Sequence, residues 1–138
     1  MFFDKKKENK EKNPSLIKIA ALLIHAAKID EKYSYEEESI IKKTLLELGA
    51  NQSELNSLLI NAKQNEEKAN QILDFTREIK NMNEKDKIKI IKSLWRIIYS
   101  NKNADMYETN LMRRLSGLLY IDGKTMGDIK EQIKKEIL

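Results

Sequence analysis

The sequence predicts an all-α, single-domain bundle of about seven helices. Its 138 residues include one proline and four glycines, which is too few for a fold built from strands and tight turns. Apolar residues recur every three or four positions over most of the chain. One arrangement of polar residues also occurs twice, with a constant offset of 71 positions, and comprises Asp30, Ser34 and Glu37, then Asn101, Asp105 and Glu108. This internal duplication predicts two pseudo-symmetric helix–acidic loop–helix halves.

The first helix is expected to follow a disordered start. Residues 1–12 are charged and low in complexity, which predicts disorder ahead of a helical domain at 13–138. Asn13 and Pro14 are typical of a helix cap and a first turn. The helix should end near Lys28, and apolar residues on all its sides predict a central, buried position.

The second helix is marked at both ends. Ser34 and Glu37 have the spacing of a capping box, and Gly49 is a typical stop. Its inner stripe is expected to consist of Ile41, Leu45 and Leu48.

Three further helices fill the middle of the chain. A short third helix is expected after Asn51 or Ser53, and a fourth after Asn65. Asn83 with Asp86 forms a cap pair that opens the fifth. The core face of the fifth helix is expected to be Ile88, Ile91, Trp95 and Ile98.

The last two helices follow the second acidic loop. Asp105 with Glu108 is expected to cap the sixth helix. A turn is expected at 122–123, and Thr125 with Asp128 should open the seventh.

Composition limits the classes of function. With no cysteine, disulfides and thiolate metal sites are excluded. The formal net charge of +4 combines 26 basic with 22 acidic residues, so the charge does not favour a nucleic-acid partner. The chain has no apolar run long enough to span a bilayer and no signal peptide, so a cytoplasmic protein is expected. Phe2, Phe3 and the lysines that follow predict at most weak contact with a membrane surface.

Several segments of the second half resemble one family. LWRIIY at 94–99 and LMRRL at 111–115, with Asn101, Asp105 and Glu108 between them, closely resemble the tellurite-resistance TerB-like family. The resemblance implies an all-helical fold with two pseudo-symmetric halves and a role in stress or tellurite resistance. It also implies binding of divalent cations through acidic residues. The chain departs from the family where Asn101 and Lys102 replace an Asp-Gly step, which weakens the second half-site.

The duplicated corners have two interpretations. If they meet, carboxylate and amide oxygens from both could hold a divalent cation such as Ca²⁺ or Mg²⁺, and the candidate ligands are Asp30, Glu37, Asn101, Asp105 and Glu108. Alternatively, the same residues are helix caps and turn residues and bind nothing.

A basic stripe offers a candidate surface for a protein partner. It runs along the fifth helix, opposite the expected core face, and the arginine pair of the sixth helix adds to it; the residues are Lys85, Lys89, Lys92, Arg96, Arg113 and Arg114. The stripe could also hold phosphate or a membrane headgroup, and together with the N-terminal Phe/Lys segment it predicts, as an alternative function, a peripheral membrane or protein–protein adaptor. The interpretation without a partner is a solvated face or, for the arginine pair, acidic residues of the same chain. His25, the one histidine, is expected at the core or its boundary. No nucleophile lies beside a suitable base, so catalysis is not expected.

Overall fold

The computed structural model describes residues 2–28, 34–69, 72–100 and 106–137, with side chains from residue 15 onward except those of 106–109. Every regular element in this part of the chain is helical. The elements are α1 (Phe2–Ala27), α2 (Tyr35–Glu47), the 3-10 turn η1 (Gln52–Glu54), α3 (Leu55–Lys68), α4 (Leu73–Ile79), α5 (Glu84–Ser100), α6 (Met106–Leu118) and α7 (Gly123–Ile137). The prediction of an all-α fold with seven helices is confirmed.

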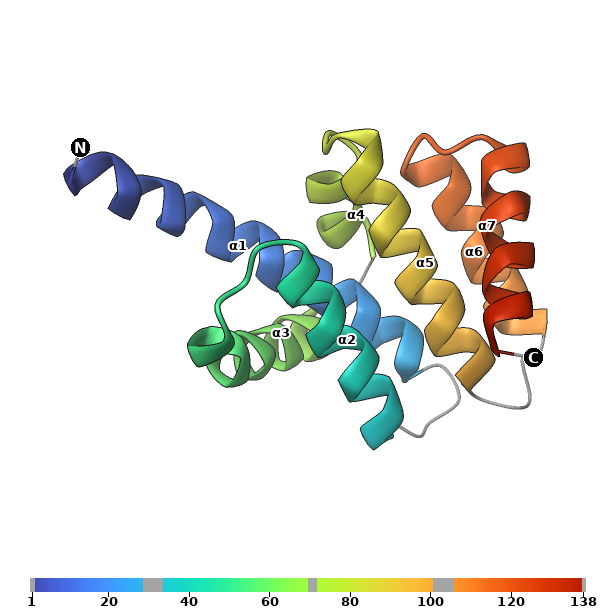
Figure 1. Cartoon of the computed structure of the whole chain (residues 1–138), viewed down its shortest axis with the longest axis horizontal. Helices are drawn as coiled ribbons and strands as arrows, with labels where there is room; N and C mark the ends of the chain where they lie inside the picture. Colours follow the sequence, from blue (N-terminus) through green and yellow to red (C-terminus); the bar gives the residue numbers. More distant parts are fainter. Residues whose placement is uncertain (1, 29–33, 70–71, 101–105, 138) are drawn as a thin grey trace.

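Helix α1 forms the centre of the molecule. It packs against α2, α3, α4 and α5, and Figure 1 shows it crossing the molecule to end beside α2 and α5. The four consecutive side chains from Ala20 to Leu23 are 0% exposed. A helix that is apolar all round has to be covered on every side, so the predicted central position is confirmed.

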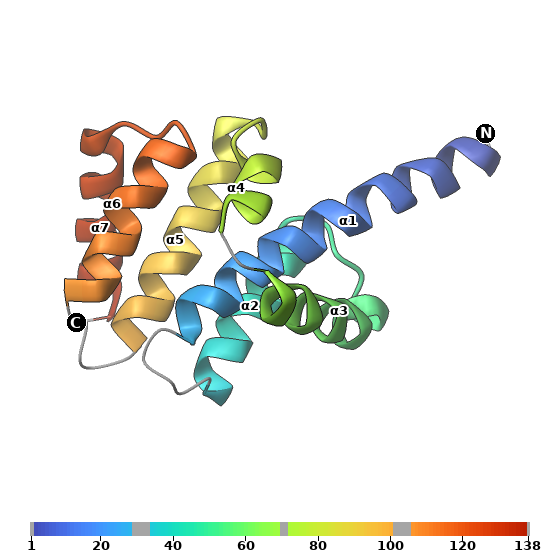
Figure 2. The ribbon, with the colours of Figure 1, turned by 180° about the vertical axis from the view of Figure 1, so that it is seen from behind.

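Helix α5 is the second organising element. It packs against α1, α2 and α7, and Figure 1 shows α2, α5 and α7 side by side. In the reverse view of Figure 2, α6 lies in front of α7. Ile91, Trp95 and Ile98 are buried as predicted, whereas Ile88 is only partly buried. Lys87 is buried beside it, and its Nζ donates a hydrogen bond of 3.1 Å to the carbonyl oxygen of Leu119.

The start predicted for the first helix at Asn13 is wrong. Helix α1 begins at Phe2, so the segment 2–12 that was expected to be disordered belongs to it. Pro14 lies inside the helix, where its missing N–H removes one backbone hydrogen bond. The lysines and glutamates of 5–12 are good helix formers, and their propensity favours extending the helix past the proline. Figure 1 shows this first part of α1 projecting beyond the other helices.

The predicted boundary between the third and fourth helices is also wrong. Asn65 does not begin a helix but lies within α3, which continues to Lys68. Its side-chain Nδ2 donates to the carbonyl oxygen of Asn61, one turn earlier, at 2.8 Å. This bond satisfies the amide inside the helix and removes the need for a cap there.

The cap of the last helix differs from the expected one by three residues. The Asp122 carboxylate accepts the backbone N–H of Thr125 at 2.7 Å, and α7 begins at Gly123. Asp122 is therefore the cap, and Thr125 lies in the first turn. The hydrogen bonds that Thr125 donates, above all the one from its backbone N–H, hold the pKa of Asp122 below its ordinary value.

The sequence repeat is reproduced in the boundaries of the helices. The first residues of α2 and α6, Tyr35 and Met106, are 71 positions apart, and so are their last residues, Glu47 and Leu118. Both helices end in the same pair of backbone bonds. The N–H groups of Gly49 and Ala50 bond to Leu46 and Leu45, and those of Tyr120 and Ile121 bond to Gly117 and Ser116. This pattern is the Schellman motif.

Candidate functional site

The first acidic corner is a complete capping box at the start of α2. The Ser34 hydroxyl accepts the backbone N–H of Glu37 at 3.2 Å, and the Glu37 Oε1 accepts the N–H of Ser34 at 2.9 Å. The predicted capping box is confirmed. It satisfies two N–H groups that would otherwise lack partners at the helix end.

Glu37 differs from its acidic neighbours by its burial. Glu36, Glu37 and Glu38 all lie in the first turn of α2, where negative charge is favoured by the helix dipole. Glu36 is exposed, and Glu38 is 3.6 Å from the ammonium of Lys63. Glu37 is only 4% exposed. A carboxylate removed from water needs hydrogen bonds or a cation to offset the lost hydration.

The side chains of the other predicted ligands are outside the part of the chain that the structure describes. Asp30, Asn101 and Asp105 are outside the described residues, and Glu108 lies in α6 but its side chain is not among those described. The prediction of a shared site requires the helices that flank the two corners to end near one another. In Figures 1 and 2, α1 and α5 end, and α2 and α6 begin, at the same end of the molecule.

An ion-pair cluster fixes the end of α1 just before the first corner. Glu66 of α3 accepts from Lys28 Nζ at 2.8 Å through Oε2 and lies 3.3 Å from His25 Nδ1 through Oε1. Its hydrogen bond raises the pKa of Lys28. His25 is partly exposed, which matches the expected boundary histidine. Glu66 was missed because its partners are 38 and 41 residues away, and no local pattern marks such a contact.

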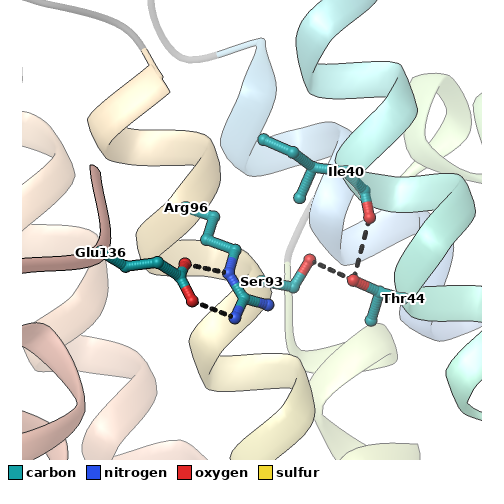
Figure 3. Close-up of polar contacts among 5 residues, drawn as sticks. All are labelled: Ile40, Thr44, Ser93, Arg96 and Glu136. Atoms are coloured by element: carbon teal, nitrogen blue, oxygen red, sulfur yellow. Dashed lines mark hydrogen bonds and ion pairs between the residues drawn. The ribbon is translucent and has the colours of Figure 1, made fainter. Parts of the chain in front are cut away.

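A matching ion pair lies near the end of α5. Arg96, 71 positions after His25, donates to Glu136 of α7 through Nε at 2.8 Å and through Nη2 at 3.1 Å (Figure 3). This bidentate bond lowers the pKa of Glu136 and raises that of Arg96. Arg96 was predicted as a contact for a partner, but the structure pairs it within the chain.

Of the other lysines in the basic stripe, two lie near acidic or carbonyl groups of the same chain and one is exposed. Lys89 lies 3.8 Å from Asp86 and 3.5 Å from the carbonyl oxygen of Glu47, at the end of α2. Lys92 is half-buried and lies close enough to Glu136 to lower its pKa further, whereas Lys85 is exposed. The stripe therefore follows the surface of α5 between α2 and α7.

Arg113 and Arg114 remain exposed on α6. Neither arginine forms an ion pair with any side chain that the structure describes. The predicted pairing with an acidic residue of the same chain is therefore not seen in this part of the protein. Two adjacent exposed guanidinium groups are suited to binding carboxylates of another molecule.

A buried hydroxyl pair joins α2 to α5. The Thr44 hydroxyl lies 2.9 Å from the carbonyl oxygen of Ile40 and 2.8 Å from the Ser93 hydroxyl (Figure 3). Because the Thr44 hydroxyl has one hydrogen, it donates to Ile40 and accepts from Ser93. Both hydroxyls are therefore satisfied, and the pair holds the two helices in register.

The predicted core position of Trp95 is confirmed, and the residue packs between α5 and α7. Its ring stacks on Tyr99 at 5.8 Å, and the ammonium of Lys130 lies 5.5 Å from its centroid. Burial and the nearby charge of Glu131 raise the pKa of Tyr99. The indole N–H of Trp95 has no acceptor among the described residues.

Comparison with protein families identifies the chain. Residues 16–131 match the family model described as tellurite resistance protein TerB. The chain belongs to the TerB family. The resemblance of the chain to the TerB-like family is thus confirmed. No curated protein and no solved structure matches this TerB protein.

The acidic corner of this TerB protein fits a hard cation by the chemistry of its donors. Carboxylate and amide oxygens are the ligands that Ca²⁺ and Mg²⁺ prefer. Over the described residues alone, no three carboxylate or imidazole side chains are grouped as a metal site would require. Four of the five predicted ligands, however, lie outside the side chains described. No helix in the same described part is long and apolar enough to cross a membrane.

Proposed function

We propose that this TerB protein is a non-enzymatic binding module that responds to a divalent cation, in a stress-response setting such as tellurite resistance. The cation would be Ca²⁺ or Mg²⁺, held by Asp30 and Glu37 of the first corner and by Asn101, Asp105 and Glu108 of the second. The single observation that supports the proposal is the common position of the helix ends. Both corners join helices whose ends lie at the same end of the molecule (Figures 1 and 2).

Glu37 has a double role in this proposal. A carboxylate offers several lone pairs, so one group can accept the Ser34 N–H and also bind a cation. The bound ion would link the α1–α2 corner to the α5–α6 corner and so fix α6.

The module would present α6 to a protein partner. Arg113 and Arg114 are exposed on this helix, and a helix held by the ion presents them in one orientation. A partner with acidic side chains would then meet two planar cations without having to order them first.

The proposal is tested by thermal denaturation with and without divalent salt at constant ionic strength. Saturating Ca²⁺ or Mg²⁺ should raise the Tm, because a ligand at a hundred times its Kd stabilises a folded protein by about 2.7 kcal/mol. The Glu37→Gln variant should lose this response. Its amide oxygen still accepts the Ser34 N–H, so the helix cap is retained.

Glu36→Gln is the matched control. It removes the same charge from an exposed residue of the same turn and should keep the full response. Two results would contradict the proposal: a wild-type Tm that neither ion changes, or equal loss of the response in both variants.

A further inference from the structure

A pocket at the junction of α1, α3 and α4 carries unpaired charge. It has a volume of about 310 Å³, and Figure 2 shows α1 passing between α3 and α4. Its polar lining includes Lys18 of α1, Gln64, Asn65 and Lys68 of α3, and Asp74 of α4. Lys18 lies nine positions before Ala27, the last residue of α1, so the pocket is separate from the acidic corners.

The positive charges of this pocket have no ion-pair partner among the side chains that the structure describes. Lys18, Lys68 and Asp74 take part in no ion pair with any side chain described. Two ammonium groups and one carboxylate leave a net positive charge at this open pocket. Such a surplus attracts an anion and is offset by binding one.

Lys18 is half-buried beside an aromatic ring. Its Nζ lies 5.9 Å from the ring centroid of Phe75, which is 1% exposed. The half-buried Lys18 stem thus lies along apolar surface, and the ring face favours the cation. An ammonium fixed in this way loses less side-chain entropy on binding an anion than a free surface lysine does.

The pocket also offers acceptors for a hydroxyl group. Asn65 directs its Nδ2 to the carbonyl oxygen of Asn61, which leaves its Oδ1 as an acceptor. The Asp74 carboxylate is a second acceptor on the opposite helix. The volume is at the small end of the range for ligand sites, about 300–1,000 Å³.

We propose that this pocket binds a small hydroxylated organic anion. Its phosphate or carboxylate group would lie between Lys18 and Lys68, and its hydroxyl groups would donate to Asp74 and Asn65. This inference is independent of the proposed cation site, because no residue is shared.

The first experiment follows the amide signals of the wild-type protein by NMR during titration. The probes are glycerol phosphate, which carries hydroxyls, and inorganic phosphate, with chloride at matched ionic strength as reference. Saturable shifts should be confined to the neighbourhood of residues 18, 64–68 and 74–75. Glycerol phosphate should bind more tightly than phosphate. Shifts that match those in chloride, or that spread over all lysine-rich surfaces, would overturn the proposal.

Variants then assign the roles. Lys18→Met and Lys68→Met keep the apolar stem and should each weaken binding about tenfold, because losing one charge-assisted hydrogen bond costs at least that factor. Asp74→Ala should reduce the advantage of glycerol phosphate over phosphate, because Asn65 then remains as the one acceptor for its hydroxyl groups. Lys135→Met removes an exposed charge from α7 and should change nothing. Equal weakening by Lys135→Met and Lys18→Met would mean general charge attraction and would refute the pocket.

Discussion

Two residues that are 71 positions apart both adopt positive φ, but only one of them is a glycine. The second residue after α2 is Gly49 with φ of 108°, and the second residue after α6 is Tyr120 with φ of 56°. Glycine adopts positive φ without steric cost, whereas a tyrosine there is strained. Lys87 supports the strained end, since its Nζ bonds to Leu119 and lies 5.9 Å from the Tyr120 ring. The position 71 residues before Lys87 holds Leu16, so the first copy lacks this support.

A pair of glycine substitutions tests the importance of backbone angle. Gly49→Ala should lower the free energy of unfolding by about 1 kcal/mol, because an L residue at positive φ is strained. Gly127→Ala, at an exposed position inside α7, should raise it by about 0.5–1 kcal/mol. A new Cβ has no neighbour within 4 Å at either position, so packing does not contribute. Urea denaturation followed by circular dichroism measures both, and effects of equal sign would contradict the explanation.

At the scale of elements, the helix sets α1–α3 and α5–α7 each contain a carboxylate on the third helix that pairs with the end of the first helix. Glu66 of α3 holds the end of α1, and Glu136 of α7 holds the end of α5. The cations differ, with His25 and Lys28 in the first copy and Arg96 in the second. The two contacts thus have the same role, whereas their cationic residues differ.

The Arg96–Glu136 pair makes stability depend on pH in acid. Its hydrogen bond lowers the pKa of Glu136 in the folded protein, so the stabilisation is present above the unfolded pKa, about 4.3, and is lost as pH falls through the lower folded pKa. Because Glu136 is half exposed, the contribution should be on the order of 0.5 kcal/mol.

Glu136→Gln tests this dependence. At neutral pH the variant should be less stable than the wild type by that amount, and the two should converge in acid. Denaturant midpoints across the acid range measure the difference. Glu131→Gln, on the exposed side of the same helix, controls for the loss of charge. A difference for Glu136→Gln that persists in strong acid would contradict the assignment to ionisation.

At the scale of the whole molecule, local patterns predicted most elements but few of the contacts between them. The caps at Ser34 and Asn83 were predictable because their partners lie three residues away. Asn65 misled the prediction, since an asparagine can cap a helix or bond back within one, and sequence alone does not distinguish the two.

The candidate sites were also only partly predictable from the sequence. The repeat predicted the candidate ligands of the two acidic corners, and the family match identified the family to which the chain belongs. The pocket beside Lys18 had no local signature, because its lining comes from three helices whose packing depends on long-range contacts. The sequence therefore predicts candidate ligands better than it predicts the cavities between helices.

The complete enclosure of Ala20 to Leu23 determines how their backbone amides exchange hydrogen with water. Helix α1 packs against four other helices, so the detachment of one of them would leave these residues covered by the rest. Their amide hydrogens should exchange only through global unfolding. They should therefore exchange more slowly than the amides of the short helix α4, which has seven residues. Native-state hydrogen exchange at these four positions should therefore give the same free energy as chemical denaturation, and faster exchange would reveal a partial opening of the centre.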